Sequence, residues 1–246
     1  MHTIRIIGPG RAGMSLAAAI GSSPRAFDVV GFLGRSDDLS QAAQGVDVLI
    51  IATPDDVVAS VAAVVEPSAS TVVLHLSGSL GLDALAPHPR RAALHPLVPL
   101  PNPEVGAARL RGGVTFAVAG DPIAAELAHC LGGRLVSVAD DDRAAYHAAA
   151  CMAANHVVAL LGQVERVAAT VGLDLEAFLP LAKAAVDDVA ALGPKDALTG
   201  PARRGDWATL SRHLDALPED ERPGYQAGAA LATKLAQLAQ PAQVAG

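Results

Sequence analysis

Cysteine, aromatic residues and clusters of basic residues are scarce in this chain of 246 residues. The two cysteines, Cys130 and Cys151, are too few for a disulfide scaffold, a composition typical of proteins in a reducing compartment. The 18 lysines and arginines are scattered and the formal net charge is -7, so neither nucleic acid nor an anionic membrane is expected as a partner.

The sequence also lacks the features of export and membrane insertion. Met1 leads directly into an apolar, strand-like run without a basic segment or a cleavage site, and no apolar run has the length expected of a membrane span. We therefore expect a soluble protein of the cytoplasm. With 51% hydrophobic residues, the chain has enough apolar material for two domains.

Apolar, β-type runs alternate with helical stretches in the first part of the chain. Runs as apolar as VLIIA (48–52) and TVVLHL (71–76) are typical of strands covered on both faces, as in a parallel sheet with crossover helices. No β-type run remains after about Asp140. We predict a doubly wound α/β domain at 1–139 and an all-α domain at 140–246. The predicted strands lie at 3–8, 27–34, 46–53, 70–78, 92–96, 113–120 and 134–140, and the predicted helices at 11–22, 55–65, 124–131, 142–171, 175–192, 207–214 and 223–238.

A glycine pattern, GPGRAG, lies between the first predicted strand and the first predicted helix. Gly8 permits a tight turn, Gly10 lets the backbone approach a pyrophosphate, and Gly13 lets the helix pack closely on the strand. The helix N-terminus then faces the anion. In this context the pattern predicts a dinucleotide site. The residues predicted to line it are Gly8, Pro9, Gly10, Arg11, Ala12 and Gly13.

The end of the second predicted strand indicates which dinucleotide binds. An NAD site would place Asp or Glu about 20 residues beyond the glycines, to hold the ribose 2'-hydroxyl. Leu33 and Gly34 stand there instead. Arg35 and Ser36 follow, and they offer a guanidinium and a hydroxyl to a 2'-phosphate. NADP is therefore the predicted cofactor.

Two further turns are expected to border the nicotinamide. Thr53 and Pro54 end one predicted strand, and Ser77 ends the next. Ligands of such sheets bind outside the carboxyl ends of the strands. The alternative is that these are ordinary turns between strand and helix, with Asp55 as a helix cap.

The motifs described so far are part of a longer series. In chain order it comprises the glycine loop, GRS, ATPDD, HLSG, HPL, YHAAACMAAN and GPKDALTGPARRGD. The series resembles the Rossmann-like proteins with a C-terminal domain of unknown function (DUF2520-type), distant relatives of ketopantoate reductases and pyrroline-5-carboxylate reductases. It covers almost the whole chain. The resemblance implies a Rossmann domain followed by helices, as in 6-phosphogluconate dehydrogenases, with NADP, a small-molecule substrate and a homodimer.

Some members of this family are regarded as alternative ketopantoate reductases of pantothenate biosynthesis. The resemblance therefore implies an NADPH-dependent oxidoreductase that reduces a small keto acid such as 2-dehydropantoate. The usual ketopantoate reductase carries a lysine, its proton donor, four residues before an asparagine. Here Asn155 matches the asparagine, but Cys151 stands at the lysine position. The proton must come from another lysine, from His147 or His95, or through water. The lysines of the chain are Lys183, Lys195 and Lys234.

Three residues are predicted to hold the substrate together with Ser77. Asn155 follows His147 and Cys151 at helical spacing and can bind a carbonyl oxygen, although a hydrogen bond between helices is the alternative. His95 precedes a proline at the end of a predicted strand, and an imidazole there can face the substrate or serve a turn. Thr199 lies in GPKDALTGPARRGD, which is predicted to be a rigid loop because of its Gly and Pro content.

Three functions stay open on this sequence. The first is the keto acid reductase. The second is an imine reductase of the pyrroline-5-carboxylate type, which needs no strong acid because its substrate is already protonated. The third is a non-catalytic, NADP-binding regulator. No metal site is predicted, because His147 and Cys151 alone supply too few ligands.

Overall fold

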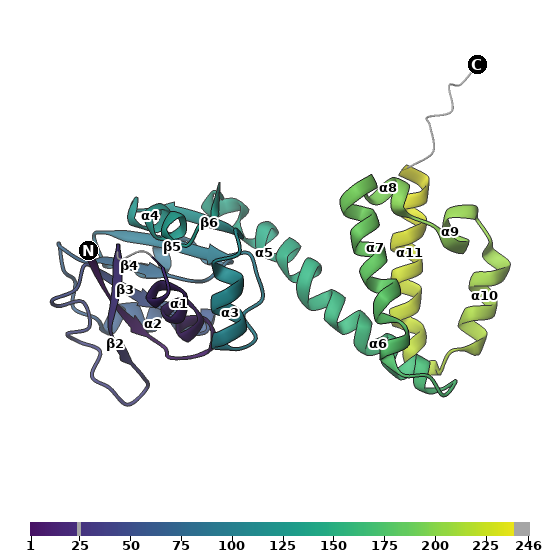
Figure 1. Ribbon diagram of the computed structural model, residues 1–246, viewed down its shortest axis with the longest axis horizontal. Coiled ribbons are helices and arrows are strands. Elements are labelled where there is room, and N and C mark those ends of the chain that lie inside the picture. The colour runs from purple at the N-terminus through teal and green to yellow at the C-terminus, as the bar shows by residue number, and fades with distance from the viewer. Residues whose placement is uncertain (24–25, 239–246) are drawn as a thin grey trace, which may run out of the picture. The chain divides into compact units, whose positions relative to one another are not determined.

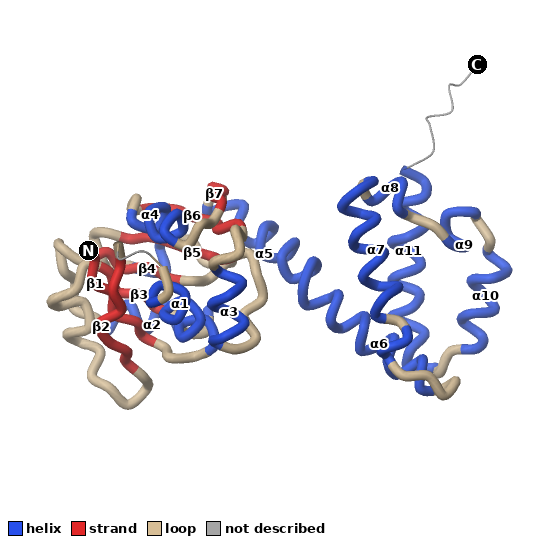
Figure 2. Tube along the Cα trace, viewed as in Figure 1, coloured by secondary structure: helices blue, strands red, loops and turns tan. Residues whose placement is uncertain are grey.

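The computed structural model describes residues 1–23 and 26–238. The chain divides into two compact units, an N-terminal unit (1–154) and a C-terminal unit (155–246). Within the described residues, strands occur in the N-terminal unit, while the C-terminal unit is built of helices (Figures 1 and 2). The predicted order, an α/β sheet followed by helices, is confirmed.

A single sheet of seven strands forms the centre of the N-terminal unit. Its order is β2-β1-β3-β4-β5-β6-β7, and every neighbouring pair is parallel except β5 and β6. β6 runs the other way because it starts beside the end of β5, where the Leu97 amide donates to the Thr115 carbonyl at 2.8 Å. The strands are β1 (His2–Ile7), β2 (Phe27–Leu33), β3 (Val48–Ile51), β4 (Val72–His75), β5 (Arg91–Pro96), β6 (Thr115–Gly120) and β7 (Arg134–Ser137).

Helices cover both faces of this sheet. Helices α1 (Arg11–Gly21), α3 (Pro103–Leu110) and α4 (Ile123–Cys130) contribute to one apolar cluster, and α2 (Asp55–Val64) contributes to the other. α1 and α3 pack directly on each other (Figure 1). Strand β3 explains why the predicted strands are so apolar: all four of its residues are buried, and they alternate between the two clusters.

Helix α3 is missing from the helices predicted from the sequence. The sequence nevertheless carries a start signal. The side chain of Asn102 accepts the Val105 amide at 2.9 Å, and Pro103 occupies the first turn, where its missing N–H costs nothing.

The predicted helix at 142–171 consists of three segments. These are α5 (Arg143–Cys151), a π-helix (Met152–His156) and α6 (Val157–Ala169). The last strand ends at Ser137, close to the predicted domain boundary at 139/140, but the compact N-terminal unit extends to Ala154 and includes α5. The π-helix thus spans the junction of the two units, and such segments occur often at functional sites.

The C-terminal unit corrects one prediction. The stretch GPKDALTGPARRGD forms two short helices rather than a rigid loop, because Pro194 and Pro201 each occupy a first helical turn, a position that favours proline. The helices of this unit are α6, α7 (Leu179–Leu192), α8 (Pro194–Ala197), α9 (Gly200–Arg204), α10 (Trp207–Ala216) and α11 (Arg222–Leu238).

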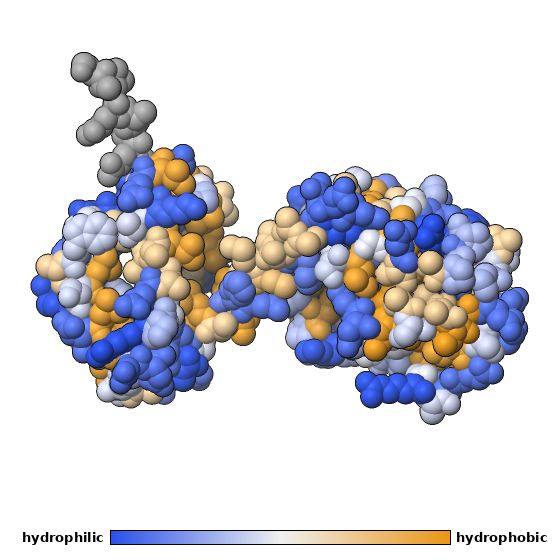
Figure 3. All heavy atoms as spheres, turned by 180° about the vertical axis from the view of Figure 1, so that it is seen from behind, coloured by the Kyte–Doolittle hydropathy of each residue, from blue (hydrophilic) through white to orange (hydrophobic). Residues whose placement is uncertain are grey.

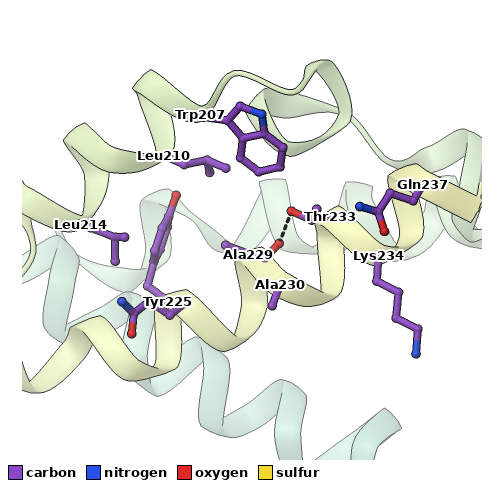
Figure 4. A pocket seen from close by; sticks show the side chains of 10 residues that line it. Trp207, Leu210, Leu214, Tyr225, Ala229, Ala230, Thr233, Lys234 and Gln237 are labelled. Carbon is purple, nitrogen blue, oxygen red and sulfur yellow. Dashed lines mark hydrogen bonds between the residues drawn. The ribbon is translucent and has the colours of Figure 1, made fainter.

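The C-terminal unit has almost no core of its own. Within residues 155–238 the buried hydrophobic side chains are Ala168, Ala202 and Ala236. Apolar side chains reach its surface in Figure 3. A groove of about 760 Å³ runs between its helices, and a smaller pocket of about 390 Å³ lies between α10 and α11, where Trp207 and Leu210 stand over α11 (Figure 4).

One helix in the described chain is long and apolar enough to cross a bilayer, judged by length and composition alone. It comprises Asp140–Ala169, in which an 18-residue window has a mean hydropathy of 1.3. The expectation that no apolar run has the length of a membrane span is therefore wrong for this helix, in which α5, the π-helix and α6 join end to end. The start of this helix packs on the sheet, since Tyr146 is hydrogen-bonded to His95.

Candidate active site at the carboxyl edge of the sheet

The ends of β1, β2 and β3 meet at Gly8. Its φ of +96° lies in the region that favours glycine, and a Cβ there would stand 2.8 Å from the Ala52 carbonyl oxygen. The Gly8 amide donates to the Leu33 carbonyl at 2.9 Å. The chain leaves β1 for β2 on one side and later returns for β3 on the other, so this is the switch point at which sheets of this type bind ligands.

The start of α1 fits a pyrophosphate. Gly10 is its N-cap, with no side-chain cap and no acidic residue in the first turn, so the amides and the positive helix end are available to an anion. A Cβ on Gly10 would meet nothing within 4 Å, whereas one on Gly13 would collide with the Gly8 carbonyl oxygen. Pro9 and Arg11 are exposed beside this cradle.

The side chains expected to choose the cofactor lie just beyond β2. Arg35 and Ser36 are both exposed there. The carboxylate of Asp37 accepts a hydrogen bond from the Gly34 amide at 2.6 Å, so it stabilises the turn. Leu33 and Gly34, where an NAD site would carry an acidic residue, have none, although the Asp37 carboxylate lies against the Gly34 amide.

Thr53 adds an unusual feature to the same edge. Its hydroxyl oxygen is buried and has no hydrogen-bond partner in the described structure. Buried polar atoms are normally paired, so this one is suited to a bound ligand. Pro54, which follows it, is exposed at the N-cap of α2.

Ser77 occupies the loop after β4 and is fully engaged. Its hydroxyl donates to the Asp55 carboxylate at 2.7 Å and accepts the amides of Ser79 and Leu80, each at 3.1 Å. The Ser79 hydroxyl donates to the same carboxylate at 2.6 Å. The alternative, in which Asp55 caps α2, is therefore wrong, because no side chain caps this helix. The Asp55 carboxylate instead holds the loop that carries Ser77.

Two imidazole rings lie against Gly78, the next residue of this loop. A Cβ at Gly78 would stand 2.6 Å from His147 Nδ1 and 2.9 Å from His95 Nε2. The Tyr146 hydroxyl lies 2.8 Å from His95 Nδ1, and the rings of His95 and His147 meet edge to face at 5.7 Å. His147 Nε2 is 3.5 Å from the sulfur of Cys151, which confirms that these two residues share a helix face.

Charged and titratable side chains, among them the buried Arg143, lie near these rings. Burial, followed by the positive electrostatic influence of His147, lowers the pKa of His95 from 6.5 to about 4. Arg143 is fully buried; its Nε donates to Asp140 at 2.9 Å, while its two terminal nitrogens have no hydrogen-bond partner in the described structure. His75 is fully buried in the core, with Nε2 3.3 Å from the Gly81 carbonyl oxygen.

This environment predicts a pH-dependent stability. His95 is neutral in the folded protein down to about pH 4, whereas the unfolded chain takes up its proton near pH 6.5, so the stability contributed by neutral His95 is lost as pH falls through this window. The groups that act on it are His147, Asp55, Arg143 and His75. Urea unfolding from pH 7 to pH 4 should show a shallower loss for His95→Gln than for the wild type. Equal pH dependence in the two proteins would contradict the buried, neutral imidazole.

The remaining predicted residues, Asn155 and Thr199, belong to the C-terminal unit. Asn155 is exposed within the π-helix, and Thr199 is exposed at the N-terminus of α9, where it lines the groove. Their roles stay predictions. The sequence reading assigned no role to Tyr146 or Arg143, whose partners are found only in the fold. Within residues 1–23 and 26–238, no cluster of three His, Cys, Asp or Glu side chains could hold a metal ion.

The fold and this edge define the class: a Rossmann protein whose sheet is followed by helices. Residues 113–232 match the family model described as "Domain of unknown function (DUF2520)", so the chain is a Rossmann protein with a DUF2520 domain, as the motifs predicted. No curated protein matches the sequence.

Solved structures share this fold along nearly the whole chain. Protein TM1727 from Thermotoga maritima is 20% identical, with 96% of this chain and 98% of that chain covered and a TM-score of 0.72. A candidate NADP oxidoreductase from Bacteroides fragilis, BF3122, is 19% identical, with 97% of each chain covered and a TM-score of 0.74. The pyrroline carboxylate reductase of Plasmodium falciparum with NADP bound is 14% identical, with 96% and 98% covered and a TM-score of 0.60.

Proposed function

We propose that this protein is an NADPH-dependent oxidoreductase that reduces a small carbonyl compound. One observation carries the proposal: an open glycine cradle at the switch point and a cluster of proton-carrying side chains lie at the same carboxyl edge of one sheet. The NADP oxidoreductase and the NADP-bound reductase among the similar structures support it.

The residues at the switch point divide the work of holding the cofactor. The amides at Gly10 and the start of α1 bind the pyrophosphate, and Arg35 with Ser36 binds the 2'-phosphate. Thr53 offers its unpaired hydroxyl near the nicotinamide half. When bound, the cofactor supplies a hydride, and the protein supplies orientation and the proton.

For the substrate, we propose a small keto acid such as 2-dehydropantoate. His95 and Tyr146 favour a carbonyl over an imine, because an alkoxide must gain a proton and these side chains carry one. The alternative, an imine reductase, is supported by the likeness to the pyrroline carboxylate reductase. A non-catalytic, NADP-binding regulator is the remaining alternative.

A panel of substrates distinguishes these functions. Purified protein is mixed with NADPH and either 2-oxo acids, including 2-dehydropantoate, or cyclic imines, and oxidation of NADPH is followed. Turnover of oxo acids is the expected result. Turnover of imines alone would favour the imine reductase, and binding of NADPH without turnover would favour the regulator.

The choice of cofactor gives a prediction. Arg35→Asp should weaken NADPH binding by roughly a hundredfold and leave NADH binding nearly unchanged, because it replaces a phosphate-binding cation by a repelling anion. Titration of both proteins with both cofactors measures this. Arg134→Asp is the control, because Arg134 is exposed on β7, and it should alter the affinity for neither NADPH nor NADH. Arg11→Asp would not serve, because Arg11 borders the glycine cradle. Equal wild-type affinities for NADPH and NADH would remove the NADP assignment.

We further propose a homodimer formed through the C-terminal unit. Helix α7 is apolar except for Lys183, Asp187 and Asp188, yet none of its residues is buried. An all-helical unit whose only buried hydrophobic residues within 155–238 are alanines gains too little from burial to be stable by itself. A second copy would cover these side chains.

A further inference from the structure

The candidate active site contains a hydrogen bond between two elements that are far apart in the sequence. His95 comes from β5 and Tyr146 from α5, and their polar atoms lie 2.8 Å apart. Their rings meet edge to face with centroids at 5.5 Å. The contact fixes both the position of the hydroxyl and the rotation of the imidazole.

Each partner of this hydrogen bond carries one proton at neutral pH. Burial raises the pKa of Tyr146 above 10, and the pKa of His95 is lowered to about 4, so at neutral pH the phenol is protonated and the imidazole carries a single proton. A neutral imidazole keeps one ring nitrogen as an acceptor, and with the phenol donating to Nδ1 the proton of the imidazole is on Nε2. Nε2 is the atom that faces Gly78, 2.9 Å from the position of its Cβ.

We propose that Tyr146 is the proton source of the reduction and that His95 relays its proton to the substrate oxygen. This inference rests on the proposed function. It identifies a proton donor in place of the lysine that ketopantoate reductases carry at the position of Cys151. His147 is the competing donor, because its Nδ1 also faces Gly78 and is buried without a hydrogen-bond partner in the described structure.

The relay balances in protons and electrons. A bound NADPH would supply the hydride that reduces the carbonyl carbon, and the C=O π pair would become a lone pair on oxygen. The alkoxide takes the proton from His95 Nε2 as Nδ1 takes the proton of Tyr146. The products are the alcohol, NADP⁺ and a tyrosinate, and His95 stays neutral with its proton now on Nδ1. The starting state returns when Nδ1 gives this proton back to the tyrosinate and Nε2 takes a proton from water.

Arg143 favours this transient tyrosinate. Its guanidinium is fully buried, and its positive charge partly offsets the effect of burial on the pKa of Tyr146. A buried cation beside a forming anion stabilises it more strongly than the same cation would in water.

Tyr146→Phe tests the relay, because it removes the hydroxyl and keeps the ring. With the oxo acid that the wild type reduces, kcat should fall by roughly a hundredfold or more, with little change in KM or in NADPH affinity. Reduction of a cyclic imine, which needs no proton donor, should be nearly unaffected. Tyr225→Phe is the matched control: its hydroxyl also lies near a histidine nitrogen, 2.6 Å from His213 Nδ1 in the C-terminal unit, and its loss should leave kcat unchanged.

A second readout needs no turnover. Nitrogen NMR of the labelled histidines should show His95 protonated on Nε2 alone at neutral pH, and in Tyr146→Phe the Nδ1 signal should move as its donor is lost. A wild-type His95 protonated on Nδ1 would overturn the relay, as would full oxo acid turnover by Tyr146→Phe. If His147→Asn loses oxo acid turnover while Tyr146→Phe keeps it, His147 is the proton donor to the substrate oxygen. Failure of the wild type to reduce any oxo acid or imine would instead remove the proposed function, and the relay with it.

Discussion

Gly10→Val should leave the fold intact and weaken NADPH binding by about a hundredfold. The backbone of Gly10 is extended, with φ -84° and ψ -169°, and a Cβ there meets nothing within 4 Å, so a larger residue can be accommodated. The added side chain occupies the space that the pyrophosphate needs. Losing one or two hydrogen bonds to a charged group, at about 1.5–3 kcal/mol each, gives an effect of this size.

Gly21→Val is the matched control for this change. Gly21 ends the same helix, and a Cβ there also meets nothing within 4 Å. Calorimetric titration with NADPH and thermal unfolding of the three proteins measure binding and stability separately. NADPH bound by Gly10→Val as tightly as by the wild type would show that the cofactor does not lie on the start of α1.

Val186→Glu should dissociate the proposed dimer and destabilise the C-terminal unit. Val186 is 62% exposed in the single chain, so a glutamate there would be harmless to a monomer. Across a dimer interface, the lost apolar burial and the buried charge together cost about 3 kcal/mol or more, which weakens the dimer roughly a hundredfold.

Val64→Glu provides the comparison, because Val64 is 55% exposed and lies on α2 of the N-terminal unit. Sedimentation equilibrium should give a dimer for the wild type and for Val64→Glu, and mostly monomer for Val186→Glu. A wild-type protein that sediments as a monomer at high concentration would refute the dimer. In that case the exposed face of α7 would need another partner.

The sequence predicted the sheet and the glycine loop well because their signals are local. Both faces of β3 are buried, so its residues must all be apolar, and only glycine fits the φ of Gly8. The prediction of a loop where α8 and α9 occur is wrong, because it treats proline as a helix breaker. Pro194 and Pro201 lie in the first turns of these helices, where proline is favoured.

The chemistry of the site was harder to predict. The expectation that His147, Cys151 and Asn155 follow one another at helical spacing holds for the first two residues, but the π-helix that contains Asn155 changes the spacing there. Tyr146 received no role because its hydrogen bond joins residues 51 positions apart. No local pattern indicates such a pairing. The signal that was available was a tyrosine directly beside His147 in a helix otherwise rich in alanine.

Transfer of deuterium from the cofactor to the product tests the central claim most directly. The protein is incubated with an oxo acid and with NADPH that is deuterated at the reactive carbon of its nicotinamide. The mass of the product is then measured by mass spectrometry. We expect a hydroxy acid that carries one deuterium on the former carbonyl carbon. In the same reaction with NADH labelled in the same way, we expect little or no deuterium in the product. A product without deuterium from the labelled NADPH, or no reduced product from any oxo acid or imine, would contradict the central claim.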